Sequence, residues 1–262
     1  MLRNVKTLEG FAIGASDGTI GKVKDFYFDD QAWAVRYIVV DTSPWLSGRE
    51  VLISPYAIGK PDWSGRILPV KISKEQIRNS PGIDAAKPIS RQFEKSYLGY
   101  YGYPYYWGGS GLWGEDMYPG TLLTGMGESS YRGYLKSTGG ADDGDPHLRS
   151  CDAVKGYDIH ARDGDIGHIQ GFILDDYTWS IRYLVVNTGN WWVGHDVVIS
   201  PEWIEEIDWS QSKVTTNLDR EAIKASPPYD GAALIDRNAE EAIYNHYDRH
   251  RYWQGRRARA AA

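Results

Sequence analysis

The chain has a single cysteine, Cys151, among 262 residues, which excludes an internal disulfide framework and any zinc site built on several thiolates. Phenylalanine and methionine are also scarce, at 5 and 3 residues, and no apolar run approaches the roughly 20 residues that a membrane-spanning helix needs. The N-terminus lacks the apolar stretch of about 7 to 15 residues that a signal peptide would carry. We therefore expect a soluble, cytoplasmic protein with no integral membrane segment.

The composition is that of a folded protein with an excess of amphipathic aromatic residues. Hydrophobic residues make up 42% of the chain and charged residues 24%, close to the averages of roughly 45–50% and 25% for soluble domains. The formal net charge of −6 argues against nucleic-acid binding by the body of the protein, because phosphate binding needs a clustered positive face. The 11 tryptophans and 19 tyrosines favour surfaces that meet other surfaces.

An internal repeat organises the sequence. The segment GASDGTIGKVKDFYFDDQAWAVRYIVVDTSPW, which starts at Gly14, returns without a gap as HARDGDIGHIQGFILDDYTWSIRYLVVNTGNW, which starts at His160, an offset of 146 positions. The same offset relates a Tyr/Gly-rich run in the first half to the C-terminal segment. The matching pairs there are Arg91 with Arg237, Glu94 with Glu240, Tyr101 with Tyr247, Tyr106 with Tyr252, and Trp107 with Trp253. Each repeat is thus a body followed by an aromatic-ended arm.

The repeat sets the expected domain limits. They are a first body over 1–84, a first arm over 85–109, a linker rich in Gly, Ser and Asp over 110–150, a second body over 151–230, and a second arm with a basic tail over 231–262. Duplication without a gap suggests a fused dimer, in which the two bodies are related by an approximate twofold axis.

Within a body the hydrophobic pattern has the period of β-strands. Residues 21–28 and 35–41 are rich in β-branched and aromatic side chains, and the second run suits a strand that is partly covered on both faces. Asp17-Gly18 and Asp163-Gly164 have the residue types of tight hairpin turns. Short strands with turns at intervals of about 8 to 12 residues indicate a small barrel or sandwich.

Helices are expected at the ends of the bodies and in the arms. Ser73 is a suitable N-cap for a short helix that ends at Arg78, and residues 237–247 form a fair helical pattern in the second arm. We expect the matching helix of the first arm to stop early, at Gly99, Gly102 and Pro104.

Both bodies share a set of motifs: the Asp-Gly turn, an Ile-Gly pair, and the strand Trp-x-x-Arg-Tyr-(Ile/Leu)-Val-Val followed by Val-x-Ile-Ser-Pro. Together these residues resemble the PRC-barrel family. The resemblance covers the two bodies and implies a compact β-barrel like that of the cytoplasmic part of the photosynthetic reaction-centre H subunit and of the C-terminal domain of a ribosome maturation factor. It also implies contact with other proteins rather than bond chemistry. We predict an all-β protein of two tandem PRC-like barrels with short helical arms, related by a pseudo-twofold axis.

Motifs for catalysis or cofactor binding are missing. No Gly-x-Ser-x-Gly sequence occurs, and Ser54 and Ser200 are each followed by proline, which is ordinary turn chemistry. The Gly-rich stretches lack the strand-to-helix context of a phosphate-binding loop. We therefore expect no enzymatic activity and no cofactor.

Histidines and paired aspartates are the candidate metal ligands. His246 and His250 stand four residues apart, a spacing that could place two imidazoles on one helical face, but no third strong ligand is predictable. The pairs Asp29-Asp30 and Asp175-Asp176 supply too few oxygens for calcium and are better explained as turn residues that pair with an arginine on the following strand, Arg36 or Arg182. We expect no metal site.

Aromatic residues at a loop tip and in the arms are the candidate partner-binding residues. Large apolar groups at the tip of a loop favour a contact with the other domain or with a partner, and the arms concentrate amphipathic rings that could clasp a neighbouring barrel. The residues singled out are Trp45, Trp191, Trp192, Tyr101, Tyr106, Trp107, Tyr247, Tyr252 and Trp253. They predict a protein partner or self-association through the loops and arms.

The C-terminal tail is a basic tip on an acidic protein, with Arg249, Arg251, Arg256, Arg257 and Arg259, and could make a peripheral contact with anionic lipid or RNA.

The function predicted is that of a non-catalytic protein-binding or assembly module. One alternative is a soluble relative of the reaction-centre H subunit that supports electron or proton transfer at a membrane complex. A second is a metal-dependent enzyme that uses the histidines of the second half.

Overall fold

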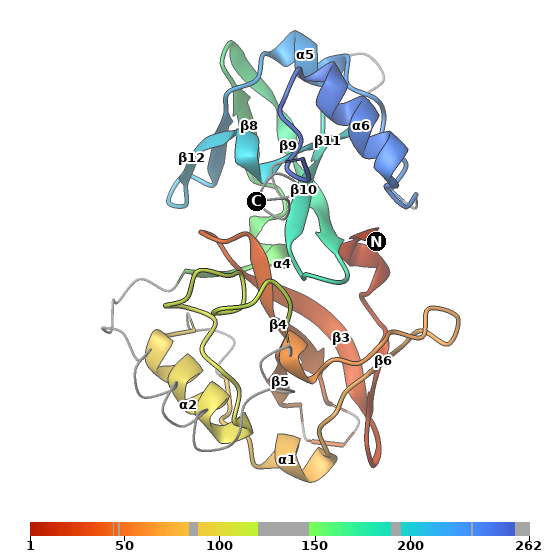
Figure 1. The fold of residues 1–262 in the computed structure, drawn as a ribbon, viewed down its shortest axis with the longest axis vertical. Helices are drawn as coiled ribbons and strands as arrows, with labels where there is room; N and C mark the ends of the chain where they lie inside the picture. The colour runs from red at the N-terminus through yellow and green to blue at the C-terminus, as the bar shows by residue number, and fades with distance from the viewer. Residues whose placement is uncertain are drawn as a thin grey trace. The chain divides into compact units, whose positions relative to one another are not determined.

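The structure is a computed structural model that describes residues 1–43, 45–46, 48–83, 89–119, 147–189, 195–231 and 233–254. It is mostly β, with two sheets that belong to two compact units. The first unit comprises Leu8–Asp152 and Tyr177–Ser180, and the second comprises Met1–Thr7, Ala153–Asp176 and Ile181–Ala262. The predicted mostly-β fold is confirmed, and the elements of each unit can be followed in Figure 1.

The sheet of the first unit has the order β5-β4-β3-β2-β6, and β7 pairs with β3. Its strands are β2 (Ala12–Ala15), β3 (Gly18–Asp29), β4 (Ala34–Asp41), β5 (Glu50–Ile53), β6 (Ile67–Pro69) and β7 (Leu148–Ser150). Its helices are α1 (Lys74–Arg78), α2 (Arg91–Tyr101) and a 3-10 turn at Pro55–Ala57.

The sheet of the second unit has the order β11-β10-β9-β8-β13-β12, and β1 pairs with β9. Its strands are β1 (Leu2–Asn4), β8 (Asp158–Ala161), β9 (Gly164–Asp175), β10 (Ile181–Asn187), β11 (Asp196–Ile199), β12 (Ile204–Asp208) and β13 (Lys213–Thr216). Its helices are α5 (Arg220–Lys224), α6 (Arg237–His246) and 3-10 turns at Val5–Thr7 and Pro201–Trp203. The short helix α4 (Cys151–Val154) lies where the chain passes from one unit to the other.

The central strands follow from the hydrophobic runs. Every residue of β4 except Asp41 is buried, so the strand is covered on both faces as its continuous run of apolar residues predicts. Gly18 and Gly164 have φ of 126° and 133° at the hairpin turns β2–β3 and β8–β9, a conformation that glycine adopts without a steric penalty. The sequence repeat is thus matched by the same hairpin in both units.

The outer strands of each sheet do not join through a continuous ladder. In the first unit, Ile58 forms one bridge with Val70 and the Gly59 N–H donates to Pro69 O, so the chain after β5 meets the end of β6. In the second unit, the chain passes from β11 through a 3-10 turn into β12, which pairs with β13. A closed barrel ladder is not found among the described residues, and the twofold relation between the repeats stays a prediction.

Each unit contains a strand from the other half of the sequence. β1 pairs antiparallel with β9, and Arg3 Nε lies 2.9 Å from Asp176 Oδ2. In the same way, β7 pairs with β3, and Arg149 Nε lies 2.8 Å from Asp30 Oδ2. Each compact unit thus combines segments from both halves of the sequence, and the predicted domain limits, which keep each repeat whole, stay a prediction.

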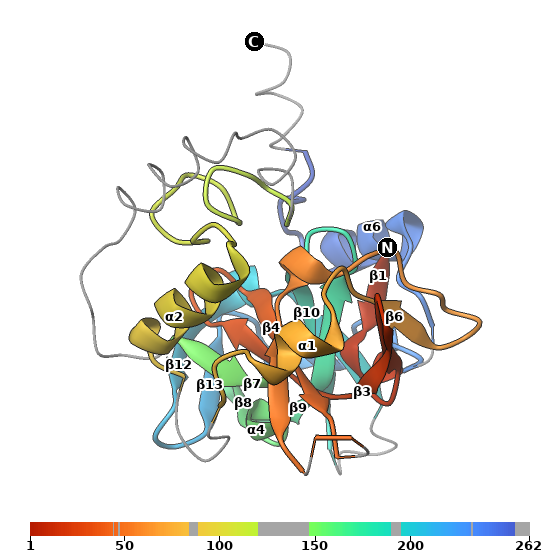
Figure 2. The same ribbon diagram turned by 90° about the horizontal axis from the view of Figure 1, so that it is seen from below.

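Both arms are integral parts of their units. α2 and α6 match the predicted helices, and α6 ends one residue before the predicted limit. The helix does end at Gly102, one of the residues predicted to stop it, whose φ of 69° closes it with a left-handed cap. It does not stop early, however, because it runs through Gly99 and is one residue longer than α6. Figure 2 shows α2 beside β4 in the first unit. Within the described part of the chain, no helix is long and apolar enough to cross a bilayer.

Candidate functional site

A buried carboxylate joins α2 to the sheet of the first unit. Glu94 is 2% exposed, and its Oε1 accepts hydrogen bonds from Tyr37 on β4, at 3.1 Å, and from Tyr106 after the helix, at 2.5 Å. Its other oxygen, Oε2, lies 2.9 Å from Arg91 Nη1 one turn earlier on α2. Burial raises the pKa of Glu94, and burial also raises the pKa of Tyr37 and Tyr106 far above the usual range.

The same network occurs in the second unit, 146 positions later. Glu240 Oε1 accepts from Tyr183 and Tyr252, each at 2.9 Å, and Glu240 Oε2 lies 2.8 Å from Arg237 Nη1. Burial raises the pKa of Glu240 and raises that of Tyr252 to about 12. Because both units carry it, we interpret this network as the part of the fold that fixes each arm to its sheet.

A second arginine, on the strand, stacks on the tyrosine of the arm. The Arg36 guanidinium lies 3.9 Å from the centre of the Tyr106 ring and 3.2 Å from Asp29 Oδ2, while Nη1 donates to Leu112 O at 2.7 Å. Asp29 also accepts from the Gln31 and Ala32 N–H groups of the β3–β4 turn. The pairing of this aspartate with the arginine of the next strand agrees with the interpretation made from the sequence.

The first unit adds a loop that has no described counterpart in the second. After Trp107 the chain makes a tight turn in which Gly111 N donates to Gly114 O and Trp113 N donates to Asp116 O. Trp113 is 1% exposed, and its Nε1 donates to Thr178 O at 2.9 Å. This part of the predicted linker is therefore packed into the unit.

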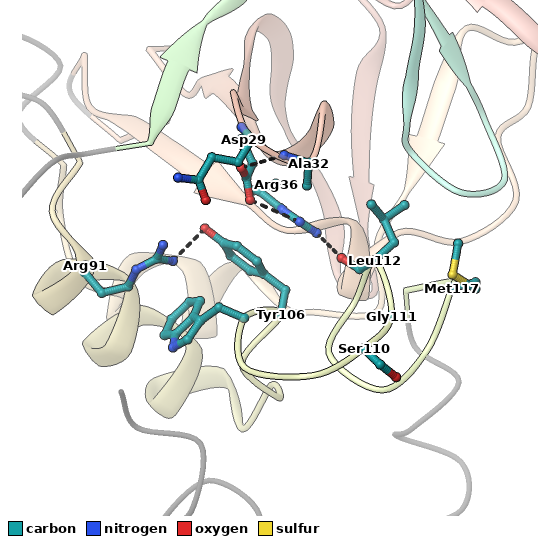
Figure 3. Close-up of a pocket in the computed structure, with 11 residues that line it drawn as sticks. Asp29, Ala32, Arg36, Arg91, Tyr106, Ser110, Gly111, Leu112 and Met117 are labelled. Carbon is teal, nitrogen blue, oxygen red and sulfur yellow. Dashed lines mark hydrogen bonds and ion pairs between the residues drawn. The ribbon is translucent and has the colours of Figure 1, made fainter. Parts of the chain in front are cut away.

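The loop encloses a hollow of about 410 Å³ together with Asp29, Arg36, Arg91 and Tyr106. In Figure 3 the Tyr106 ring stands between Arg91 and the loop that carries Ser110, Gly111 and Leu112. Arg91 also lies 4.1 Å from the centre of the Trp107 ring, and Met117 adds an apolar wall. The volume is in the range of small-ligand pockets, roughly 300–1,000 Å³.

The side chains that line the hollow are suited to binding. The full set is Asp29, Gln31, Ala32, Arg36, Arg91, Tyr106, Trp107, Ser110, Gly111, Leu112 and Met117. Asp29 is the carboxylate among them, and it is already bonded to Arg36 and to two turn N–H groups. None of the lining residues is a histidine, lysine or cysteine. The set therefore offers cationic donors and aromatic faces instead of a paired nucleophile and base.

Comparison with known proteins identifies the first body. Residues 4–77 match the PRC-barrel domain model. Residues 4–77 form a PRC-barrel domain. No curated protein matches the chain. The match ends at Ile77, so the PRC-barrel domain covers β2 to β6 and α1 up to its last residue but one, and it includes neither β7, nor α2, nor the loop that encloses the hollow.

Two of the predicted partner-binding residues, Tyr106 and Trp107, line the hollow beside the PRC-barrel domain. Tyr101 stands on α2, where it packs against Tyr97 and stacks on Tyr103. Trp45 is half-buried, its Nε1 donates to Ile20 O, and Lys74 and Arg78 of α1 lie over its ring.

The remaining predicted partner-binding residues belong to the second half of the chain. Tyr247 packs against Trp203, and Trp253 lies against Tyr244 and Arg237. Tyr252 takes part in the Glu240 network. Trp191 and Trp192 lie outside the described residues. A partner role for all nine residues stays a prediction.

The sequence reasoning missed Arg36, Arg91 and Glu94 as parts of a site. The signal was present, because Arg91 and Glu94 recur in register at Arg237 and Glu240, and a repeated Arg-x-x-Glu with two tyrosines is unusual for a solvated arm. Of the candidate metal ligands, His246 donates through Nε2 to Ala222 O at 2.7 Å. No cluster of three or more possible metal ligands occurs within the described ranges.

Proposed function

We propose that the protein is a non-catalytic module that binds a protein partner through the hollow of the first unit. The observation that carries this proposal is the combination of arginine, tyrosine and tryptophan around one concave site. These are the residue types that dominate the binding energy of protein interfaces. Two of the predicted partner residues, Tyr106 and Trp107, line this hollow and support the proposal.

A contrast between the repeats supports the choice of the first unit. The glutamate network is common to both and serves the fold. The loop with Leu112 and Trp113 occurs in the first unit, where it covers Arg36 and leaves Arg91 18% exposed, whereas Arg237 is 51% exposed. Among the residues that the structure describes, this loop has no counterpart in the second unit, and this makes it a candidate for a specific function.

The proposal is tested by crosslinking from the hollow. A photo-crosslinking amino acid at Ser110, which lines the hollow and is exposed, should capture a discrete partner when the full chain is exposed to extract from its own cells. The same amino acid at the exposed Gln254 of the second unit is the matched position. Recovery of the Ser110 adduct should fall at least tenfold in the Trp107→Ala variant. An adduct that forms equally at both positions, or that survives Trp107→Ala unchanged, would refute the proposal.

The alternatives from the sequence have tests of their own. A relative of the reaction-centre H subunit would co-fractionate with membranes, and a metal-dependent enzyme would carry stoichiometric metal by elemental analysis of the purified protein. The cytoplasmic location is likewise a proposal that fractionation tests. No feature of the described residues favours either alternative over partner binding.

A further inference from the structure

Arg91 keeps one edge of its guanidinium unused. Its Nη1 bonds to Glu94 and to Tyr106, at 2.9 and 3.0 Å. Within the part of the chain that the structure describes, Nε and Nη2 of Arg91 form no hydrogen bond. An arginine side chain has five N–H donors in a planar fork, and the Nε–Nη2 edge is one that binds a carboxylate with two parallel hydrogen bonds.

Arg36, whose side chain also lines the hollow, has an unpaired donor as well, and so does its counterpart Arg182 in the second unit. Its Nε is buried and has no hydrogen-bond partner, although Nη1 and Nη2 are bonded to Leu112 O and Asp29. An unpaired buried N–H costs free energy comparable to a lost hydrogen bond. Two arginines with unsatisfied donors therefore line one concavity.

The existing charges limit the ligand to one negative charge. Arg36 and Arg91 are balanced by Asp29 and Glu94, and Asp29 already accepts two backbone N–H bonds. A dianion such as phosphate would meet two carboxylates in a half-enclosed site, where repulsion is poorly screened. A planar monoanion can use the free edge of Arg91 without this penalty.

One side of the hollow is apolar, so the ligand should carry an apolar group next to its anionic group. Leu112, Met117 and Trp107 line it. Contact with these side chains favours a carboxylate that is carried next to an aliphatic or aromatic group.

We infer that the hollow receives a carboxylate group carried beside an apolar side chain of the partner, bound by Arg91 and Arg36. This inference rests on the proposed function, of which it names the chemistry. The carboxylate has two sources in a protein, an acidic side chain or the C-terminus of the chain, and both offer the same planar group.

The test uses the full chain and four probes. Acetyl-leucyl-glutamate amide presents a side-chain carboxylate, acetyl-glycyl-leucine presents a C-terminal carboxylate, acetyl-leucyl-glutamine amide is the neutral match, and inorganic phosphate is the dianion. Binding is measured by calorimetry and by the NMR signals of the indole N–H groups of Trp107 and Trp253, assigned with Phe variants. Trp107 reports on the hollow, and Trp253 is its counterpart in the second unit.

One of the carboxylate peptides should shift the Trp107 signal and leave that of Trp253 in place, and the glutamine peptide and phosphate should bind at least tenfold more weakly. Arg91→Gln should weaken the carboxylate peptide roughly tenfold to hundredfold, as expected for a lost charged hydrogen bond. Arg237→Gln should leave its affinity unchanged. Arg91→Lys keeps the positive charge but lacks the two parallel N–H donors of the guanidinium, so it should bind the peptide more weakly than the wild type does. This variant replaces Arg91→Gln in the test if Arg91→Gln fails to fold.

Equal binding of the glutamine peptide, preference for phosphate, equal loss with Arg237→Gln or no binding of either carboxylate would overturn the inference. The proposed function fails separately, on the Ser110 crosslink. A Trp107-dependent adduct without carboxylate binding leaves the binding module standing and removes only the ligand chemistry.

Discussion

At the scale of single residues, the two buried glutamates hold an arm to each sheet. A buried carboxylate is costly unless it is paired and hydrogen-bonded, and each of these accepts from two tyrosines and an arginine. The geometry is directional, because the tyrosine hydroxyl from the strand meets one oxygen of the helix carboxylate. We therefore expect the network to fix the position of the arm more than to add net stability.

Removing one of these carboxylates should show how strongly the stability of each unit depends on the glutamate network. Glu94→Ala leaves two buried tyrosine hydroxyls without their carboxylate acceptor and Arg91 without its ion-pair partner, so the free energy of unfolding of the first unit should fall by about 3–5 kcal/mol. Glu240→Ala should have a similar effect on the second unit. Urea unfolding followed by NMR signals from each unit measures the two losses separately. A loss below about 1 kcal/mol would show that the arm is held by its aromatic contacts instead.

The same carboxyls should make stability depend on pH. Burial raises the pKa of Glu94 above its unfolded value of 4.5, so between 4.5 and the raised value the folded state binds more protons than the unfolded state. The contribution of Glu94 to the free energy of unfolding is therefore greatest at low pH and decreases as the pH rises through this window. Compared with Glu94→Gln, which does not titrate, the wild type should gain stability as the pH is lowered from about 7.5 to about 5. A difference that is independent of pH would contradict this assignment.

At the scale of strands and helices, much of the fold follows from local sequence. The Asp-Gly turns, the buried run of β4 and the N-cap of α1 at Ser73 are found where the residue pattern predicts them. β1 could not be predicted, because it is three residues long and pairs with a distant strand of the other repeat, Leu2 with Asp175 and Asn4 with Ile173. Tyr106 and Trp107 were singled out, but Arg36, Arg91 and Glu94 were missed, because the arm was interpreted as a clasp for a neighbour and the partners of its tyrosine lie on β4 and α2.

The Ile-Gly pair of the PRC-barrel domain has a steric cause that can be tested. A Cβ on Gly21 would lie 2.0 Å from Asp41 O, so β3 and β4 could not keep their spacing. Gly21→Ala should destabilise the first unit by about 1–3 kcal/mol, the range of overpacking. Gly99→Ala is the matched control, since a Cβ there meets nothing within 4 Å and alanine favours a helix by about 1 kcal/mol. Thermal unfolding should move in opposite directions for the two variants, and a neutral Gly21→Ala would refute the steric explanation.

Ion pairs hold the strands that each unit takes from the other half: Arg3 and the N-terminal amine pair with Asp176 at β1, and Arg149 pairs with Asp30 at β7. Arg149→Glu would place a second carboxylate beside that of Asp30, which directly follows β3 and is largely buried. We expect a loss of about 1–2 kcal/mol and faster amide exchange in β7, and partial recovery in the double variant Arg149→Glu, Asp30→Arg. Arg3→Glu should act in the same way on β1 through Asp176. Unchanged exchange in β7 would mean that the backbone ladder alone holds the strand.

At the scale of the whole molecule, each unit contains segments from both halves of the sequence. This arrangement should determine whether the two halves stay together after the backbone is cleaved between them. Cleavage at a protease site placed within 120–146 produces one fragment with β1 and another with β7. Each fragment then supplies a strand to the unit that the other mainly builds. The fragments should co-elute in size-exclusion chromatography after cleavage and separate only in denaturant. Fragments that separate in native buffer would show that these strand pairings are too weak to matter.

The pairing of β1 with β9 also affects how shorter versions of the protein should be designed. If the boundary is placed between the two sequence repeats, the C-terminal fragment lacks β1, and the edge of β9 that pairs with β1 is left without a partner. Unpaired strand edges promote aggregation. Grafting Met1–Thr7 onto such a piece through a flexible spacer would restore the covering strand. For this protein, the useful boundaries for recombinant halves run across the repeats rather than between them.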